Sequence, residues 1–305
     1  MLNTRRLQRS SGRTFRALTG MSRNDFRRLL PSFARAFEEQ ERRQSESSKR
    51  QRKPGAGGKR ALERMDDLLL FILVYFNVYP TQDLQALLFG LTQPWAHKWI
   101  HRLTPVLRQA LGYEKQLPLR RTRSTEDLQR LCPELEFLLD GTERPVVRPS
   151  KEPTQRERYS GKKKRHTVKN NIVSSRKTKK VLLLGATAPG KTHDKRMVDD
   201  EPILFPPGSV LHQDLGFQGH VPLGVDVRQP KKKPRKAELS PTDKEHNRVI
   251  SQVRIGVEHT IGGVKISNIV HDIYRNRTKG FEDTVIEIAC GLHNHRVDGR
   301  LKMAA

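Results

Sequence analysis

The chain has 305 residues, with 59 lysines and arginines against 33 aspartates and glutamates, so its formal net charge is +26. Such an excess of positive charge repels itself unless an anionic partner is bound; nucleic acid is the first candidate and a membrane surface the second. Two cysteines without a CxxC pair exclude a disulfide scaffold and a thiolate zinc site. The longest apolar run, Leu68–Phe76, is far shorter than the roughly 20 residues that a bilayer span requires.

The N-terminal region predicts a basic, helical segment over residues 1–38. Apolar residues recur at spacings of three and four between positions 14 and 38, as on one face of a helix. Ser22 and Asp25 form an S-x-x-D pattern that is typical of a helix start. Residues 39–60 have almost nothing to bury, and we interpret them as a solvated helix end followed by a flexible linker.

Residues 61–112 predict three helices separated by short turns. Thr81 is placed to cap the second helix, Gln82–Leu88, and Thr92 to cap the third, with a turn at Gly90 between them. A helix, a short turn with glycine and a helix with a basic outer face are typical of a helix-turn-helix, although an ordinary three-helix bundle has the same pattern. The candidate DNA contacts on the polar face of the third helix are Gln93, His97, Lys98 and His101, whereas Trp95 and Trp99 are predicted to be core anchors.

From Leu131 the pattern changes to strands followed by helices, which predicts a mixed α/β domain over residues 131–305. Asp140 and Asp214 each follow an apolar run and are expected at strand ends, and Glu258 lies in a long helix that begins at Ser240-Pro241. Three carboxylates brought together repel one another and need cations, and hard oxygen ligands select Mg²⁺ or Mn²⁺. The sequence therefore suggests a site for two divalent ions.

Arg254 and Glu258 lie on a polar stripe beside the apolar face of this helix. Such a stripe can line a groove, with Arg254 as a phosphate contact. The alternative is a solvated face on which the two residues form an ordinary i,i+4 ion pair.

Five strings along the chain carry a resemblance to a known family. The chain resembles the DDE transposases of bacterial insertion sequences, in the group related to eukaryotic Harbinger elements. The matching strings are LLDGTERPV around Asp140, QRERYSGKKKRHTVKN at 155–170, PGKTHDK at 189–195, HQDLGFQGH around Asp214 and RIGVEHTIGGVK around Glu258.

This resemblance implies an RNase H-like catalytic domain over 131–305, preceded by an all-α helix-turn-helix region. Asp140, Asp214 and Glu258 would be the catalytic acids and would hold two Mg²⁺ or Mn²⁺ ions. The implied chemistry is hydrolysis of the phosphodiester at the element's ends, followed by attack of the freed 3′-hydroxyl on target DNA. A DNA-binding regulator that has lost cleavage is the alternative.

The resemblance also implies double-stranded DNA as the partner, a homodimer or larger assembly on that DNA, no membrane partner, and a cytoplasmic, nucleoid-associated protein. His193 and Asp194 are expected to support the metal ligands from behind, with a helix cap as the alternative role of Asp194. The expected phosphate contacts of the catalytic domain are Lys162, Lys163, Lys164, Arg165, Lys169 and Arg254.

Overall fold

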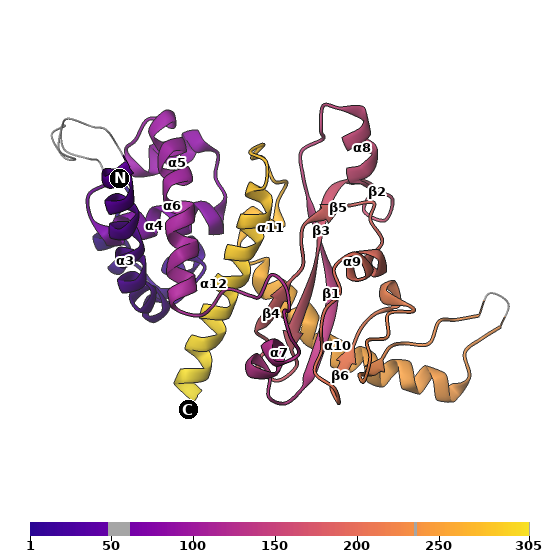
Figure 1. Ribbon diagram of the computed structural model, residues 1–305. Coiled ribbons are helices and arrows are strands. Elements are labelled where there is room, and N and C mark those ends of the chain that lie inside the picture. Colours follow the sequence, from indigo (N-terminus) through magenta and orange to yellow (C-terminus); the bar gives the residue numbers. More distant parts are fainter. Residues whose placement is uncertain (48–61, 235–236, 305) are drawn as a thin grey trace. The chain divides into compact units, whose positions relative to one another are not determined.

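The computed structural model describes residues 1–47, 62–234 and 237–304. The fold is mixed α/β, and the chain divides into two units (Figure 1). Unit 1 comprises Met1–Leu117, Ile266–Val270 and Thr284–Ala305, and unit 2 comprises Pro118–Lys265 and His271–Asp283. None of the helices in the described parts of the chain is long and apolar enough to cross a membrane.

Unit 1 is helical. Thr81 caps α5 as predicted, because its side chain accepts a hydrogen bond from the Leu84 N–H, but Thr92 makes no such bond at the start of α6. The helices are α1 (Thr4–Gln8), α2 (Gly12–Thr19), α3 (Arg23–Ser47), α4 (Met65–Val78), α5 (Gln82–Phe89), α6 (Gln93–Tyr113), α11 (Asn268–His271, through Val270) and most of α12 (Phe281–Ala304).

The first apolar segment forms two helices where one was expected. Gly20 ends α2 in the left-handed conformation, with φ of 74°, and α3 begins after the predicted cap, in which Ser22 and Asp25 bond each other's backbone N–H groups. Helix α3 then continues to Ser47, so the helix end that was expected within 39–60 extends over residues 39–47. Residues 48–60, with the expected flexible linker, lie outside the described residues.

Unit 2 is built on a curled sheet. Strand β1 pairs antiparallel with β3 and parallel with β6, which gives the order β2-β3-β1-β6-β7, while β4 and β5 also pair with β3. The strands are β1 (Glu136–Pro145), β2 (Tyr159–Ser160), β3 (Arg165–Ser175), β4 (Val181–Leu184), β5 (Ala188–Pro189), β6 (Val210–His212) and β7 (Asp226–Arg228). The helices are α7 (Glu126–Leu131), α8 (Glu152–Arg158), α9 (Asp194–Asp200), the 3-10 turn η1 (Leu215–Phe217) and α10 (Pro241–Val264).

The two faces of β1 have different roles. Phe137 and Leu139 belong to a hydrophobic core with Val198 of α9 and Phe217 of η1. Leu138 points to the other face, where α10 packs closely enough that a Cβ at Gly256 would lie 3.2 Å from a Leu138 methyl carbon. Because side chains alternate along a strand, Asp140 lies on the α10 face.

Most of α12 belongs to unit 1, whereas the sequence placed it in the 131–305 domain. The Arg108 guanidinium of α6 donates to the Glu287 carboxylate at 2.6 Å, and a Cβ at Gly291 would lie 3.1 Å from Leu111. The apolar pattern of the helix indicates that it is buried but not which neighbour buries it.

Gly190 offers a test of this packing. A Cβ there would lie 2.9 Å from two backbone carbonyl oxygens, those of Arg158 at the end of α8 and Thr167 in β3, whereas a Cβ at Gly161 would meet nothing within 4 Å. We expect Gly190→Ala to lower the free energy of unfolding by about 1–3 kcal/mol, and Gly161→Ala to have little effect. Chemical denaturation of both variants measures this, and equal stabilities would contradict the packing described.

Candidate active site

Asp140 lies in the middle of β1, not at a strand end as predicted. The strand continues through Gly141 to Pro145, because its register with β3 extends to the pair Pro145 and Thr167. The cross-strand hydrogen bonds of β3 thus override the break expected at Asp140-Gly141. The carboxylate of Asp140 accepts from the Gly141 N–H at 2.8 Å and is largely buried.

Asp214 lies next to this position because β6 runs parallel to β1. It follows β6 and caps η1, where its Oδ1 accepts from the Gly216 N–H at 2.7 Å. Arg254 of α10 joins the two acids, since its Nη2 lies 3.5 Å from Asp140 Oδ2 and 3.9 Å from Asp214 Oδ2. The fold therefore brings two of the three predicted acids around one positive charge.

Asp194, at the start of α9, is a third carboxylate near this pair. A Cβ at Gly216 would lie 2.8 Å from Asp214 Oδ1 and 2.9 Å from Asp194 Oδ2, so only glycine at position 216 lets both carboxylates approach. The ammonium of Lys169 compensates part of this charge, because its Nζ lies 3.2 Å from Asp194 Oδ1. The helix cap is His193, whose side chain makes no capping bond and which is exposed.

The electrostatics of Asp140 reflect this crowding. Burial raises its pKa to about 6, and the negative charges of Asp214 and Asp194 act in the same direction. The charge of Arg254 and the hydrogen bond from the Gly141 N–H oppose the rise. Ionisation of Asp140 in the folded protein therefore costs free energy unless more positive charge is supplied.

Glu258 lies outside the cluster of Asp140, Asp214 and Asp194. It is exposed on α10. It forms no ion pair with Arg254, so the alternative of an ordinary i,i+4 ion pair between these two described residues was wrong. Within the described ranges, no group of three His, Cys, Asp or Glu residues is close enough to hold a metal ion.

Lys265 is a residue of this region that the sequence analysis missed. Its Nζ donates to the Glu143 carbonyl of β1 at 3.5 Å, and burial is the main cause that lowers its pKa. Arg254, Glu258 and Lys265 fall within about 40° of one another around α10. The signal available in the sequence was the spacing of these residues, four from Arg254 to Glu258 and seven from Glu258 to Lys265, which places them on one side of a helix.

The basic segment between β2 and β3 is exposed throughout. Lys162, Lys163 and Lys164 lie in a turn, with Lys164 in the left-handed conformation at φ of 53°, and Arg165 begins β3. Lys169, predicted to contact phosphate, instead lies within β3 and pairs with Asp194. Its positive charge is therefore paired with the acidic cluster in this structure.

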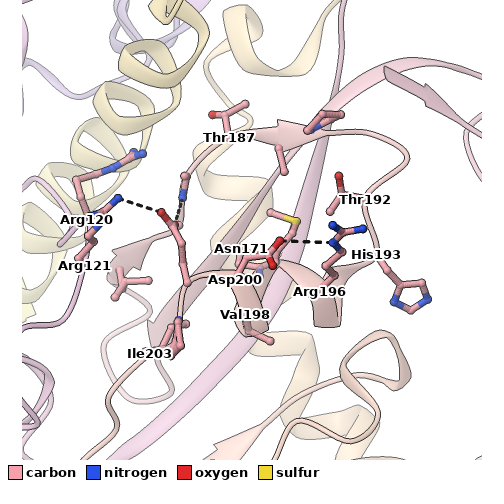
Figure 2. A pocket seen from close by; sticks show the side chains of 18 of the residues that line it. Arg120, Arg121, Asn171, Thr187, Thr192, His193, Arg196, Val198, Asp200 and Ile203 are labelled. Atoms are coloured by element: carbon pink, nitrogen blue, oxygen red, sulfur yellow. Dashed lines mark hydrogen bonds and ion pairs between the residues drawn. The ribbon is translucent and has the colours of Figure 1, made fainter. Parts of the chain in front are cut away.

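A cavity of about 690 Å³ opens beside α9 (Figure 2). Ion pairs lie along its wall between Arg121 and Glu201 and between Arg196 and Asp200. The buried side chain of Asn171, opposite Gly141 on β3, reaches the same cavity, and His193 also lines it.

The candidate DNA contacts of unit 1 lie at the start of α6. Gln93, His97 and Lys98 are exposed, and the rings of His97 and His101 lie 4.4 Å apart. Burial, followed by the charge of His97, lowers the pKa of His101. Trp99 is buried as predicted. Trp95 is 54% exposed and lies under the Lys98 ammonium, so its prediction as a core anchor was wrong.

Comparison with known proteins places this arrangement in a family. The pattern of the DDE superfamily endonucleases matches residues 139–294, a segment that contains Asp140, Asp214 and Glu258. The chain belongs to this family, and the similar proteins are transposases of insertion sequences.

Two relatives support this assignment. The chain is 28% identical over 287 residues to a probable transposase for insertion sequence element IS702 of Microchaete diplosiphon, covering 94% of this chain and 95% of that protein. It is 24% identical over 237 residues to a putative transposase for insertion sequence element IS112 of Streptomyces albus G, covering 77% and 81%. No solved structure matches the chain.

The raised pKa of Asp140 predicts a pH-dependent stability. The folded state holds this proton up to about pH 6, whereas the unfolded state loses it near 3.8, so wild-type stability falls as the pH rises between these values. Asp140→Asn has no carboxyl group to ionise, so this loss of stability with rising pH is absent from the variant. In EDTA we expect the variant to equal the wild type near pH 4 and to exceed it by up to about 3 kcal/mol at pH 7.5.

Urea unfolding at the two pH values measures this difference. Asp226→Asn, which alters an exposed acid of β7 in the same sheet, is the matched control and should leave the pH profile unchanged. A stability difference for Asp140→Asn that does not change with pH would contradict the burial of an ionising carboxyl group.

Proposed function

We propose that this DDE-family protein is a transposase that binds element-end DNA, cleaves its phosphodiester bonds and transfers the 3′-hydroxyl ends to target DNA by two-metal-ion catalysis. One observation carries the proposal. Asp140 on β1 and Asp214, just beyond the end of the neighbouring parallel strand β6, are far apart in sequence but have a single guanidinium, that of Arg254, between them. Such a pair of carboxylates is the minimum arrangement that can bind divalent metal ions at a sheet.

The residues present suit such ions. The guanidinium of Arg254 shows that a positive charge is accommodated between the two acids, and carboxylate oxygens are the donors that Mg²⁺ and Mn²⁺ prefer. Asp140, Asp214 and Glu258 would hold the ions. When bound, they would activate the attacking water or hydroxyl and stabilise the leaving oxygen.

Glu258 can join the site from its present position on α10. Arg254 and Lys265, on the same stripe of the helix, both reach β1, at Asp140 and Glu143. The stripe therefore faces the border of β1 beyond its pairing with β6, and Glu258 lies between Arg254 and Lys265 along the stripe. A glutamate side chain with free rotamers can turn toward that border at a small cost.

The other residues of unit 2 would bind and orient the DNA. The exposed cations from Lys162 to Arg165 would contact phosphates, which supply most of the affinity of proteins for DNA. Lys169 would compensate the charge of Asp194, with Asp194 as a supporting residue behind the ligands. We assign the sheet and α10 to an RNase H-like domain.

Unit 1 would position the protein on the element ends. Helices α5 and α6 and the turn at Gly90 are proposed as a helix-turn-helix, with Gln93, His97, Lys98 and His101 on its DNA-facing side. Because two element ends have to be joined, a homodimer or larger assembly on DNA is proposed as the active form. Light scattering that shows only monomers on paired end DNA would contradict this assembly.

Cleavage of DNA carrying the parent element's ends tests the catalytic proposal. We expect cutting with Mg²⁺ or Mn²⁺, none in EDTA, and a fall of at least about 100-fold for Asp140→Ala, because the site loses a metal ligand. Asp226→Ala, which removes an exposed carboxylate elsewhere in the sheet, should retain activity. Binding without cutting in every variant would favour a DNA-binding regulator instead.

The salt dependence of DNA binding tests the role of α6. Each phosphate contact contributes about 0.9 to the slope of log affinity against log salt, so Lys98→Ala should weaken binding and reduce the slope by roughly that amount. Lys302→Ala, at an exposed lysine of α12, is the matched control. Equal slopes for both variants and the wild type would exclude Lys98 as a phosphate contact.

A further inference from the structure

Arg254 occupies an unusual position for a residue predicted to contact DNA phosphate. Its Nη2 points at Oδ2 of both Asp140 and Asp214, at 3.5 and 3.9 Å, and its Nε is buried without a hydrogen-bond partner among the described residues. The side chains of the three residues are 19%, 18% and 30% exposed, so the charges meet where water screens them only in part.

The distances from Arg254 Nη2 to the two carboxylates are those of an ion pair and are long for a directional hydrogen bond. A bidentate arginine–carboxylate pair has two parallel N–H···O bonds shorter than about 3 Å to one carboxylate. Arg254 instead uses one nitrogen toward two carboxylates, at distances typical of an ion shared between them. Lys169 donates a hydrogen bond to the single carboxylate of Asp194 at 3.2 Å, so each part of the acidic cluster has its own cation.

We propose that Arg254 is an internal counter-ion of the metal-free site, which competes with divalent metal for Asp140 and Asp214 and is released from them when the metal site fills. This inference rests on the proposed function and adds a regulation of that site. One guanidinium and a metal ion cannot both occupy the space between the same two oxygens. The two states of Arg254 are therefore linked to metal occupancy.

The release of Arg254 has a consequence for DNA. In the metal-free state its charge is consumed by the two acids, and after release the same charge lies on the α10 stripe with Lys265. A released guanidinium at this border is available to a phosphate of the bound strand. Arg254 thus couples the filling of the site to the positive charge offered to DNA, and it acts as a positioning residue.

The test compares Mn²⁺ binding, by isothermal titration calorimetry without DNA, in wild type, Arg254→Gln and Arg254→Lys. Removing the competing charge should tighten Mn²⁺ binding by about fivefold to tenfold in Arg254→Gln. Arg254→Lys retains the charge and should bind Mn²⁺ as the wild type does. Arg228→Gln, at an exposed arginine paired with Asp226 at 3.1 Å, is the matched control and should change nothing.

Thermal unfolding provides a second readout that does not depend on activity. In EDTA, Arg254→Gln should unfold at a lower temperature than Arg254→Lys, because two neighbouring carboxylates lose their counter-ion. Saturating Mn²⁺ should raise its midpoint by more than it raises that of the wild type. A purely structural arginine would leave the metal-induced shift the same in all proteins.

The outcomes separate the two levels of the proposal. Weaker or unchanged Mn²⁺ binding in Arg254→Gln, with normal binding in the wild type, would overturn the competition and leave the metal site in place. Absence of Mn²⁺ binding in all the proteins would overturn the metal site itself, and the competition with it. Tighter binding in Arg254→Gln alone supports the inference.

Discussion

The charge of Arg254 between Asp140 and Asp214 is the interaction on which the arrangement of the site depends. Two carboxylates at this distance repel each other, and partial burial strengthens the repulsion. Helix α10 carries the compensating guanidinium, and it is held in place by the Ser240 cap at its start and by the close approach of Gly256 to Leu138. The position of one long helix on the sheet thus controls the electrostatics of the acids.

Glycine makes the same crowding possible on the other side of the acids. Gly141 and Gly216 leave space for Asp194, whose carboxylate would lie 3.2 and 2.9 Å from their missing Cβ atoms. Any side chain at either position would move Asp194 or the strand. The resulting cluster has more negative than positive charge. Burial is the main cause of the raised pKa of Asp140, and the negative charges of Asp214 and Asp194 add to it. Such a site favours additional cations.

The segment that matches the DDE superfamily endonucleases, residues 139–294, contains the three acids that the sequence singled out. The chemistry proposed for this family requires mainly that the backbone bring acids from β1, the end of β6 and α10 to one border of a sheet. The basic turn before β3 and the exposed start of α6 add the positive charge that a DNA partner requires.

The sequence by itself determined the elements whose signals are local. The Ser22, Thr81 and Ser240 caps, the apolar face of α10 and the strands around Asp140 and Asp214 were predicted from spacing and composition, because capping and amphipathicity involve neighbouring residues. The order of the matched strings likewise identified the family.

The tertiary structure decided what depends on partners far along the chain. Pairing with β3 extended β1 through Asp140 to Pro145, and packing against α6 placed α12 in unit 1. Helical spacing put Trp95 on the apolar face, yet its side chain is largely exposed in the structure. Only the packed fold turns Arg254 to the acids and brings Lys265 to Glu143. These outcomes follow from which surfaces meet, and local spacing carries no information about the partner surface.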